Sequence, residues 1–253
     1  MKSRFLLPIL ALAAFASPLV AQEPKKAVET PAASGRKGPK VDPDPTQALL
    51  EKLKPEQREK VKKAVNEAST YVAGIRLQEA LARLSEAEAI EPGLFVVHNL
   101  KGAVYTKMRD FAKARSAFEK AEQLNPQSYH PKFNLAELDF VEKKFEKALA
   151  AFDKLLAHPQ ADDSTKKLIQ FKQVICYLKL EKKDEAEKLI KSFSYIDDEP
   201  VFYMSHAAKE FAAGKREEAQ SYIDSANRIY SAEALTIYFD SFIEMGWVET
   251  LTQ

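Results

Sequence analysis

The feature that most constrains this chain is a recurrence with a period of about 34 residues. An alanine followed four residues later by a large apolar residue occurs at regular intervals through the sequence. The pairs are Ala80 and Leu84, Ala114 and Phe118, Ala148 and Phe152, Ala186 and Ile190, and Ala219 and Ile223. Successive alanines lie 34, 34, 38 and 33 residues apart. Such a period is typical of proteins in which one supersecondary unit stacks on the next.

A second position, twelve residues before each alanine, is usually small. It holds Ala68, Gly102, Ala136 and Ala207, with Val174 as the exception. Two antiparallel helices approach closely only where the contacting residues are small, so the pattern predicts repeated pairs of helices. The longest step contains four extra residues at 161–164, Ala-Asp-Asp-Ser. Because these are turn and cap residues, we expect a loop insertion that leaves the stack intact.

The segment 95–128 contains further residues at defined intervals. It contains Gly102-x-x-Tyr105, Ala114-x-x-x-Phe118, Ala121 and Pro126. With these residues the segment resembles the tetratricopeptide repeat, a helix–turn–helix unit of about 34 residues. His98 and Lys101 depart from the Trp and Leu that are usual in the family. The resemblance implies an all-α fold, a right-handed solenoid of stacked antiparallel helix pairs.

The sequence predicts three segments: a signal peptide over 1–21, a linker over 22–45 and a repeat array over 46–253. We expect a short N-terminal helix, a second helix from Pro55 to about Ala73, and about five repeat units. Their expected bounds are 61–94, 95–128, 129–166, 167–199 and 200–232, with a cap over 233–253. Apolar residues at helical spacing predict that the cap begins with a helix from Ala232 to Glu244, covering the last unit. Gly246 would end this helix, and Trp247 would fold back on it.

The N-terminus has the pattern of a secretory signal. Lys2 and Arg4 precede an apolar run from Phe5 to Phe15, which is too short to span a bilayer. Cleavage after Ala16 or Ala21 is open, with Ala21 favoured, and an uncleaved N-terminal anchor is the alternative. We therefore expect a periplasmic or secreted protein of a bacterial envelope, with no integral membrane segment after cleavage.

Composition restricts the classes of partner and of chemistry that we expect for this chain. Prolines, glycines and nearly balanced charges over 22–45 predict an extended, disordered linker. The whole chain has 38 basic and 37 acidic residues, which gives no electrostatic case for nucleic-acid binding. Cys176 is the single cysteine, so no internal disulfide can form, and we expect it to be a buried apolar residue.

The sequence shows no catalytic motif. It lacks a glycine-rich phosphate loop, His-Glu-x-x-His, paired cysteines and a nucleophile elbow. His98 and His130 begin successive first helices and could approach each other, but a metal site would need further ligands. Asp162-Asp163 favours a helix cap over a hydrolytic pair. We therefore expect no enzyme, no cofactor and no metal.

The resemblance implies a binding surface instead. In this family the first helices line a concave groove, and positions 2, 5, 9 and 12 of each unit tend to face it. The residues expected to contact a partner are Asn99, His130, Phe133, Glu137, Phe140, Phe171, Met204 and Phe211. These positions become more apolar toward the C-terminus, and an exposed apolar patch marks a partner site. An amphipathic helix is the natural ligand for such a groove.

We expect an exported, non-enzymatic scaffold that binds a protein or peptide in this groove. The alternative is a homo-oligomeric structural module that uses the same apolar face for self-association. A subset of the family binds acidic C-terminal tails of heat-shock chaperones through Lys, Asn and Arg. Asn66, Asn134 and Lys172 lie near those positions here, but apolar residues hold most of the others, which disfavours that function.

Overall fold

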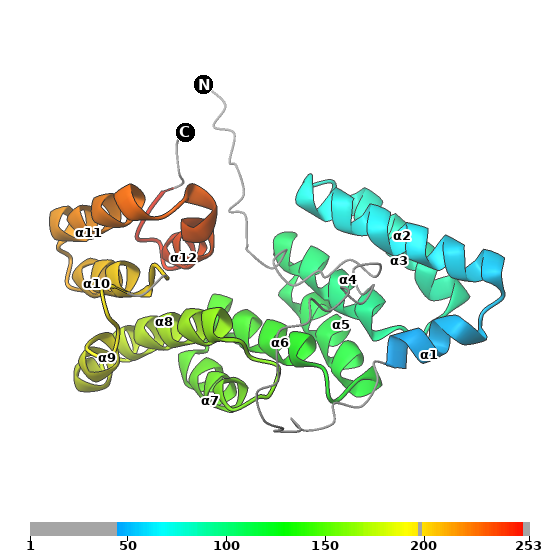
Figure 1. Ribbon diagram of the computed structural model, residues 1–253, viewed down its shortest axis with the longest axis horizontal. Coiled ribbons are helices and arrows are strands. Elements are labelled where there is room, and N and C mark those ends of the chain that lie inside the picture. The colour runs from blue at the N-terminus through cyan, green and yellow to red at the C-terminus, as the bar shows by residue number, and fades with distance from the viewer. Residues whose placement is uncertain (1–44, 197–198, 250–253) are drawn as a thin grey trace, which may run out of the picture. The chain divides into compact units, whose positions relative to one another are not determined.

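The structure is a computed structural model that describes residues 45–196 and 199–249 (Figure 1). Over these residues the chain forms twelve α-helices and no strand, which confirms the all-α helical-repeat class. None of the described helices is long and apolar enough to cross a membrane. The predicted signal peptide and all of the predicted linker except Pro45 lie outside the described residues. The described helices fall into two compact parts, an N-terminal half (45–127) and a C-terminal half (128–249).

The N-terminal half contains five helices. They are α1 (Pro45–Lys52), α2 (Pro55–Ala73), α3 (Leu77–Ile90), α4 (Phe95–Lys107) and α5 (Phe111–Leu124). Helix α2 pairs with α3, α4 pairs with α5, and α3 packs against α4. Arg58 of α2 fixes the end of α1, because its guanidinium donates hydrogen bonds to the backbone carbonyls of Leu50 (2.8 Å) and Glu51 (3.0 Å).

The C-terminal half contains seven helices. They are α6 (Tyr129–Val141), α7 (Phe145–Leu156), α8 (Asp163–Lys179), α9 (Lys183–Ile190), α10 (Val201–Ala212), α11 (Arg216–Ile229) and α12 (Ala232–Glu244). Helices α6, α8 and α10 each pair with the helix that follows, and α8 packs against both α7 and α10. Helix α12 spans the residues predicted for the last helix.

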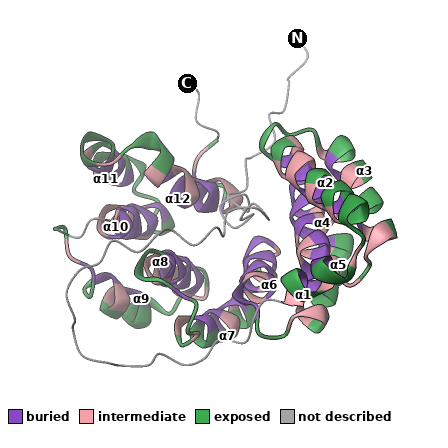
Figure 2. Ribbon diagram, turned by 45° about the vertical axis from the view of Figure 1, so that its right-hand side comes forward, coloured by how far each residue is buried: buried purple, intermediate pink, exposed green. Residues whose placement is uncertain are grey.

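The recurring alanines and large apolar residues form the core of each pair. All ten side chains of the recurrence are at most 2 % exposed. The first helix of a pair is more buried than the second, as the purple and green segments in Figure 2 show. Nine of the 13 residues of α4 are buried, against three of the 14 residues of α5. First helices are therefore enclosed on more sides, as expected for stacked pairs.

Each pair turns through one residue in the left-handed conformation. These residues are Ile75, Arg109, Lys143, Glu181 and Gly214, with φ between 58° and 76°. They are 34, 34, 38 and 33 residues apart, the same steps as the alanines. The next amide bonds back to a carbonyl five residues earlier, as Asp110 does to Tyr105 (2.9 Å), which is the pattern of a Schellman cap.

The four extra residues at 161–164 do not form the expected loop. Helix α8 already begins at Asp163 and has 17 residues, whereas α4 and α6 have 13 each. The Asp162 carboxylate caps it by accepting the backbone N–H of Thr165 (2.7 Å). The extra length thus adds about one turn to a helix. The loop prediction was wrong for Asp163 and Ser164, while the cap prediction is confirmed for Asp162.

Helix α12 ends where the sequence predicts, but it contacts more of the chain than predicted. Gly246 is left-handed (φ 71°), and the Trp247 amide donates to the Phe242 carbonyl (2.9 Å). Trp247 is 8 % exposed and folds back on α12, its ring centroid 5.8 Å from that of Phe242. However, α12 does more than cover the last pair, because it also contacts α8.

Candidate partner-binding face

The residues predicted to contact a partner lie on first helices. Asn99 is half-buried on α4, and His130 is half-buried at the start of α6. The others are buried: Phe133, Glu137 and Phe140 on α6, Phe171 on α8, and Met204 and Phe211 on α10. None of these six is more than 9 % exposed. The expected exposed apolar patch is therefore absent at these positions of the described chain, because the chain's own side chains cover them.

Part of that cover comes from α12, which lies against α8 and α10 (Figures 1 and 2). The Phe171 ring is 4.8 Å from the ring of Tyr238 and 5.8 Å from that of Phe242. Phe211 is 5.3 Å from Phe242 and stacks on Trp247 at 5.8 Å. Phe171 and Phe211, both predicted to contact a partner, are thus already in contact with α12 of the same chain.

A buried lysine joins three helices beneath this aromatic contact. The Lys172 ammonium on α8 lies 3.0 Å from the Glu137 carboxylate on α6 and donates to the Ser241 hydroxyl on α12 (3.0 Å). It also lies 4.7 Å from the centre of the Phe140 ring. Lys172, Glu137 and Ser241 are 5 %, 8 % and 1 % exposed. We call Glu137, Phe140, Phe171, Lys172 and Phe211 the first-helix face.

The electrostatics at the centre of the first-helix face are not fully balanced. Burial raises the pKa of Glu137, the neighbouring Lys172 lowers it, and Glu244 of α12 raises it again. The net direction is upward. One Glu137 oxygen, Oε1, has no hydrogen-bond partner among the described residues. Asp240, also on α12, is a further buried carboxylate at 8 % exposure. The Glu137 carboxylate is thus only partly satisfied by Lys172.

Sequence reasoning did not select Lys172 and Ser241 as site residues. Each is a polar residue at a position that packing encloses, Lys172 beside Phe171 and Ser241 beside Phe242. A polar residue inside an apolar stripe was the available signal, because buried charges are seldom left unpaired. The partner could not be identified from sequence, since Lys172 and Ser241 are 69 positions apart.

The structure places the other candidate groups in ordinary surroundings. The His98 Nε2 is 3.0 Å from the Pro92 carbonyl oxygen, and its Nδ1 is 3.7 Å from the Glu88 carboxylate. Among the described residues, no cluster of three or more His, Cys, Asp or Glu side chains is placed to hold a metal ion. Cys176 is fully buried, as expected, and burial raises the pKa of its thiol.

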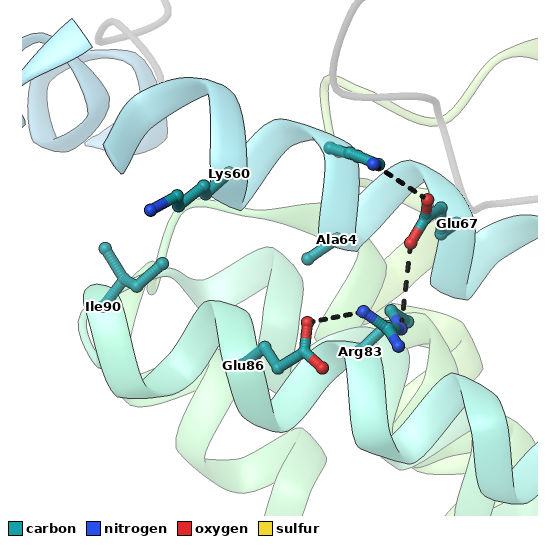
Figure 3. Close-up of a pocket in the computed structure, with 7 residues that line it drawn as sticks. Lys60, Ala64, Glu67, Arg83, Glu86 and Ile90 are labelled. Atoms are coloured by element: carbon teal, nitrogen blue, oxygen red, sulfur yellow. Dashed lines mark hydrogen bonds and ion pairs between the residues drawn. The ribbon is translucent and has the colours of Figure 1, made fainter. Parts of the chain in front are cut away.

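A pocket of about 360 Å³ lies between α2 and α3 (Figure 3). Its lining residues are Lys60, Lys63, Ala64, Glu67, Arg83, Glu86 and Ile90. Arg83 pairs with Glu86 (2.8 Å) and Glu67 (3.7 Å), and Lys63 pairs with Glu67 (3.8 Å). The lining carboxylates are thus already matched by lining cations, and the pocket carries no arrangement that favours a particular ligand.

Comparison with family models agrees with the repeat architecture. The family model described as "Tetratricopeptide repeat" matches residues 105–170, from within α4 to within α8. Among solved structures, the chain is similar to YrrB, described as a TPR protein with an unusual peptide-binding site. That match has 18 % identity, covers 77 % of this chain and 96 % of that chain, and has a TM-score of 0.48. The curated proteins contain no match.

The helix pairs and the family match support one conclusion. Residues 105–170 match the family, and helix pairs with the same left-handed turn continue on both sides of that segment. The chain therefore matches the tetratricopeptide repeat over residues 105–170, within a longer series of similar helix pairs.

Proposed function

We propose that this chain is an exported, non-enzymatic scaffold that binds a protein or peptide partner on its first helices. Tetratricopeptide repeats generally form interaction scaffolds rather than catalytic sites, which supports a protein or peptide as the partner. The positive and then apolar start of the sequence supports export. The first-helix face supports the location of the site.

The observation that carries this proposal is the contact between α12 and the first-helix face. Phe171 and Phe211 contact aromatic side chains of α12, and Lys172 donates a hydrogen bond to a hydroxyl of the same helix. Recognition of an amphipathic helix needs this combination of apolar anchors and an orienting polar group. A face held rigid by stacked pairs also loses little conformational entropy on binding.

The binding test must avoid buried positions. Phe140 and Phe171 are 1 % and 0 % exposed, so a glutamate at either would test folding rather than recognition. Lys179 is a better probe, because it is exposed and its ammonium lies 4.7 Å from the Trp247 ring, at the edge of the face. Lys188, exposed on the second helix α9, is the matched control.

A photo-crosslinking amino acid in place of Lys179 is expected to yield a discrete adduct with an envelope protein. The same amino acid in place of Lys188 is expected to yield none. Adducts at position 188 alone, or equally at both, would reject the first-helix face as the site. An adduct with twice the mass of the chain would instead support self-association, and sedimentation over a concentration series would measure it.

Export has an independent test. Expression in a bacterium with an envelope is expected to give a mature chain that begins at Gln22, after cleavage behind Ala21. N-terminal sequencing of the envelope fraction measures this directly. A chain that begins at Ser17 would move the cleavage to Ala16, and a full-length cytoplasmic chain would reject export.

A further inference from the structure

We propose that α12 is a built-in competitor for the first-helix face, and that the partner is an amphipathic helix with the contact pattern of α12. The pattern is an aromatic residue, a hydroxyl three positions later and a second aromatic directly after it, as in Tyr238, Ser241 and Phe242. This inference rests on the proposed function and specifies its ligand.

The contacts of α12 are those of a short linear motif. Residues three and four apart lie on one face of a helix, so Tyr238, Ser241 and Phe242 point the same way. The two aromatics contact Phe171, Phe242 also contacts Phe211, and Ser241 accepts from Lys172. One turn of helix thus contacts the three central residues of the first-helix face. A partner helix with the same three side chains would find the same contacts.

Helix α12 is also attached differently from the other first helices. Helices α6, α8 and α10 are each clamped by a second helix that follows them. Helix α12 ends in the same left-handed turn at Gly246, but the described chain then continues only to Glu249. Within the described residues no second helix clamps it. Within the described residues, its docking involves side-chain contacts with α8 and α10 and packing against α11, which precedes it.

The interface beneath α12 is more polar than a permanent core. Lys172 and Glu137 form a buried ion pair, and the buried Ser241 hydroxyl of α12 accepts a hydrogen bond from Lys172. Burying an ion pair carries a desolvation penalty that its attraction often only balances. Departure of α12 would return these groups to water, including Oε1 of Glu137. This gain offsets part of the lost aromatic contact, as in interfaces that exchange partners.

The buried Oε1 of Glu137, which lacks a hydrogen-bond donor among the described residues, indicates the charge that a partner would avoid. Glu244 of α12 raises the pKa of Glu137, which means that the two carboxylates repel each other. A partner helix with a neutral or basic residue at the position of Glu244 would avoid this repulsion. The fitting partner is thus a helix with α12's aromatic and hydroxyl pattern and fewer acidic residues.

The test uses the full chain and a fluorescent peptide with the sequence of residues 231–249. In the wild type, docked α12 should keep the peptide's affinity low. Phe242→Ala in the chain removes contacts of α12 with Phe171, Phe211 and Trp247 and should free the face. Affinity for the wild-type peptide should then rise at least about tenfold, because a larger fraction of the chains has a free first-helix face.

Two controls separate displacement from loss of stability. Phe118→Ala removes a fully buried ring from α5 in the N-terminal half, outside the first-helix face, so it should not raise peptide affinity. A peptide that itself carries the Phe242→Ala change should bind the freed chain weakly. Equal peptide affinity in wild type and in folded Phe242→Ala chain, measured by anisotropy, would overturn the proposal.

Hydrogen exchange on the wild-type chain gives a result even if Phe242→Ala fails to fold. The amides of α12 should exchange faster than those of α8 and α10, because α12 opens without the pairs. Equal protection of all three helices would reject a displaceable α12. If Lys179 still crosslinks a partner while α12 stays protected, the proposed function stands and only the competition is wrong. If Lys179 yields no adduct while the peptide binds, α12 is displaceable and the proposed partner-binding function is rejected.

Discussion

At Gly102, helix α4 lies very close to a side chain of α5. A Cβ at this position would lie 2.4 Å from two ring carbons of Phe118, which is fully buried and has little room to move. Gly102→Ala should therefore destabilise the fold by about 1–3 kcal/mol, the usual range for overpacking. Urea unfolding followed by circular dichroism measures this change.

Gly74→Ala is the matched control for that substitution. Its Cβ would meet nothing closer than the Thr70 carbonyl oxygen at 3.6 Å, and its φ of −84° suits any residue. The expected result is no loss, or a gain of up to about 1 kcal/mol from the less flexible unfolded chain. Similar losses at Gly74 and Gly102 would show that the ring contact is not the cause.

Phe118→Ala tests the same contact from the other side. The ring is 0 % exposed, so its removal should cost about 3–5 kcal/mol. With the ring gone, Gly102→Ala should cost much less than in the wild type, because the two residues are in contact. A double-mutant cycle by urea unfolding gives the coupling. Independent, additive effects would contradict the packing at this position.

At the scale of single residues, sequence predicted the packing of the helix pairs better than the burial of the candidate contact residues. The small residue and the large apolar residue were recognisable because their spacing repeats along the chain. Lys172 and Ser241 were not recognisable as partners, because the first-helix face is assembled from helices far apart in sequence. The side chains of Phe171 and Phe211 were correctly assigned to first helices, but their cover by α12 was not predicted.

At the scale of elements, α8 shows what a repeat template misses. Asp, Asp and Ser at 162–164 suit a loop and also suit the first turn of a helix, where acidic residues favour the dipole. Periodicity counted four surplus residues but could not distinguish a longer loop from a longer helix. The cap at Asp162 shows that the surplus residues begin a helix, and the contribution of this cap to stability can be tested.

Asp162→Ala should destabilise the chain by about 1 kcal/mol through loss of the N-cap of α8. Asp162→Asn should retain most of the stability, because an amide oxygen can also accept the Thr165 amide. Hydrogen bonds from the Thr165 side chain and backbone hold the pKa of Asp162 below its usual value. Its charged form therefore stabilises the fold above about pH 4, the unfolded value, and this contribution is lost as the pH falls through the folded pKa.

Unfolding midpoints of the wild type and Asp162→Asn, compared from pH 7 to pH 2, measure this contribution. The difference between the two chains should be constant near neutrality and should shrink only below about pH 4. A difference that grows on acidification would contradict the assigned cap.

The turn at Ile75 is another element with a testable cost. Ile75 has φ 58°, which is unfavourable for a β-branched residue, and its side chain is 49 % exposed. Ile75→Gly should stabilise the chain by up to about 1 kcal/mol, after the entropy of an added glycine is subtracted. Thermal unfolding measures the gain. Ile75→Ala is the control, and an equal gain there would show that φ is not the reason.

At the scale of the whole molecule, the fold class follows from sequence because, within each half, a helix pair mainly contacts its neighbour in the chain. Neighbouring pairs repeat the same spacing, so their contacts are visible as a period. The docking of α12 extends beyond the neighbouring pair to α8, and this contact leaves no period in the sequence. This long-range contact could be found only in three dimensions.

Cys176 provides a probe for the C-terminal half as a whole. The thiol is 0 % exposed, and burial raises its pKa, so a thiol reagent near neutral pH should react only after the surrounding helices open. The labelling rate should rise with urea in parallel with unfolding. One thiol should react in fully denatured protein, and rapid stoichiometric labelling of the native chain would contradict the burial.

The position of Trp247 has a practical consequence for reagents. Trp247 stacks on Phe211, and Glu249 follows two residues later, so a group introduced at Glu249 starts close to the first-helix face. A tag or display linker attached there would be present at high local concentration and would compete with ligands in solution. An affinity handle inserted at an exposed turn, such as the one before Lys183, would keep the docking surface clear.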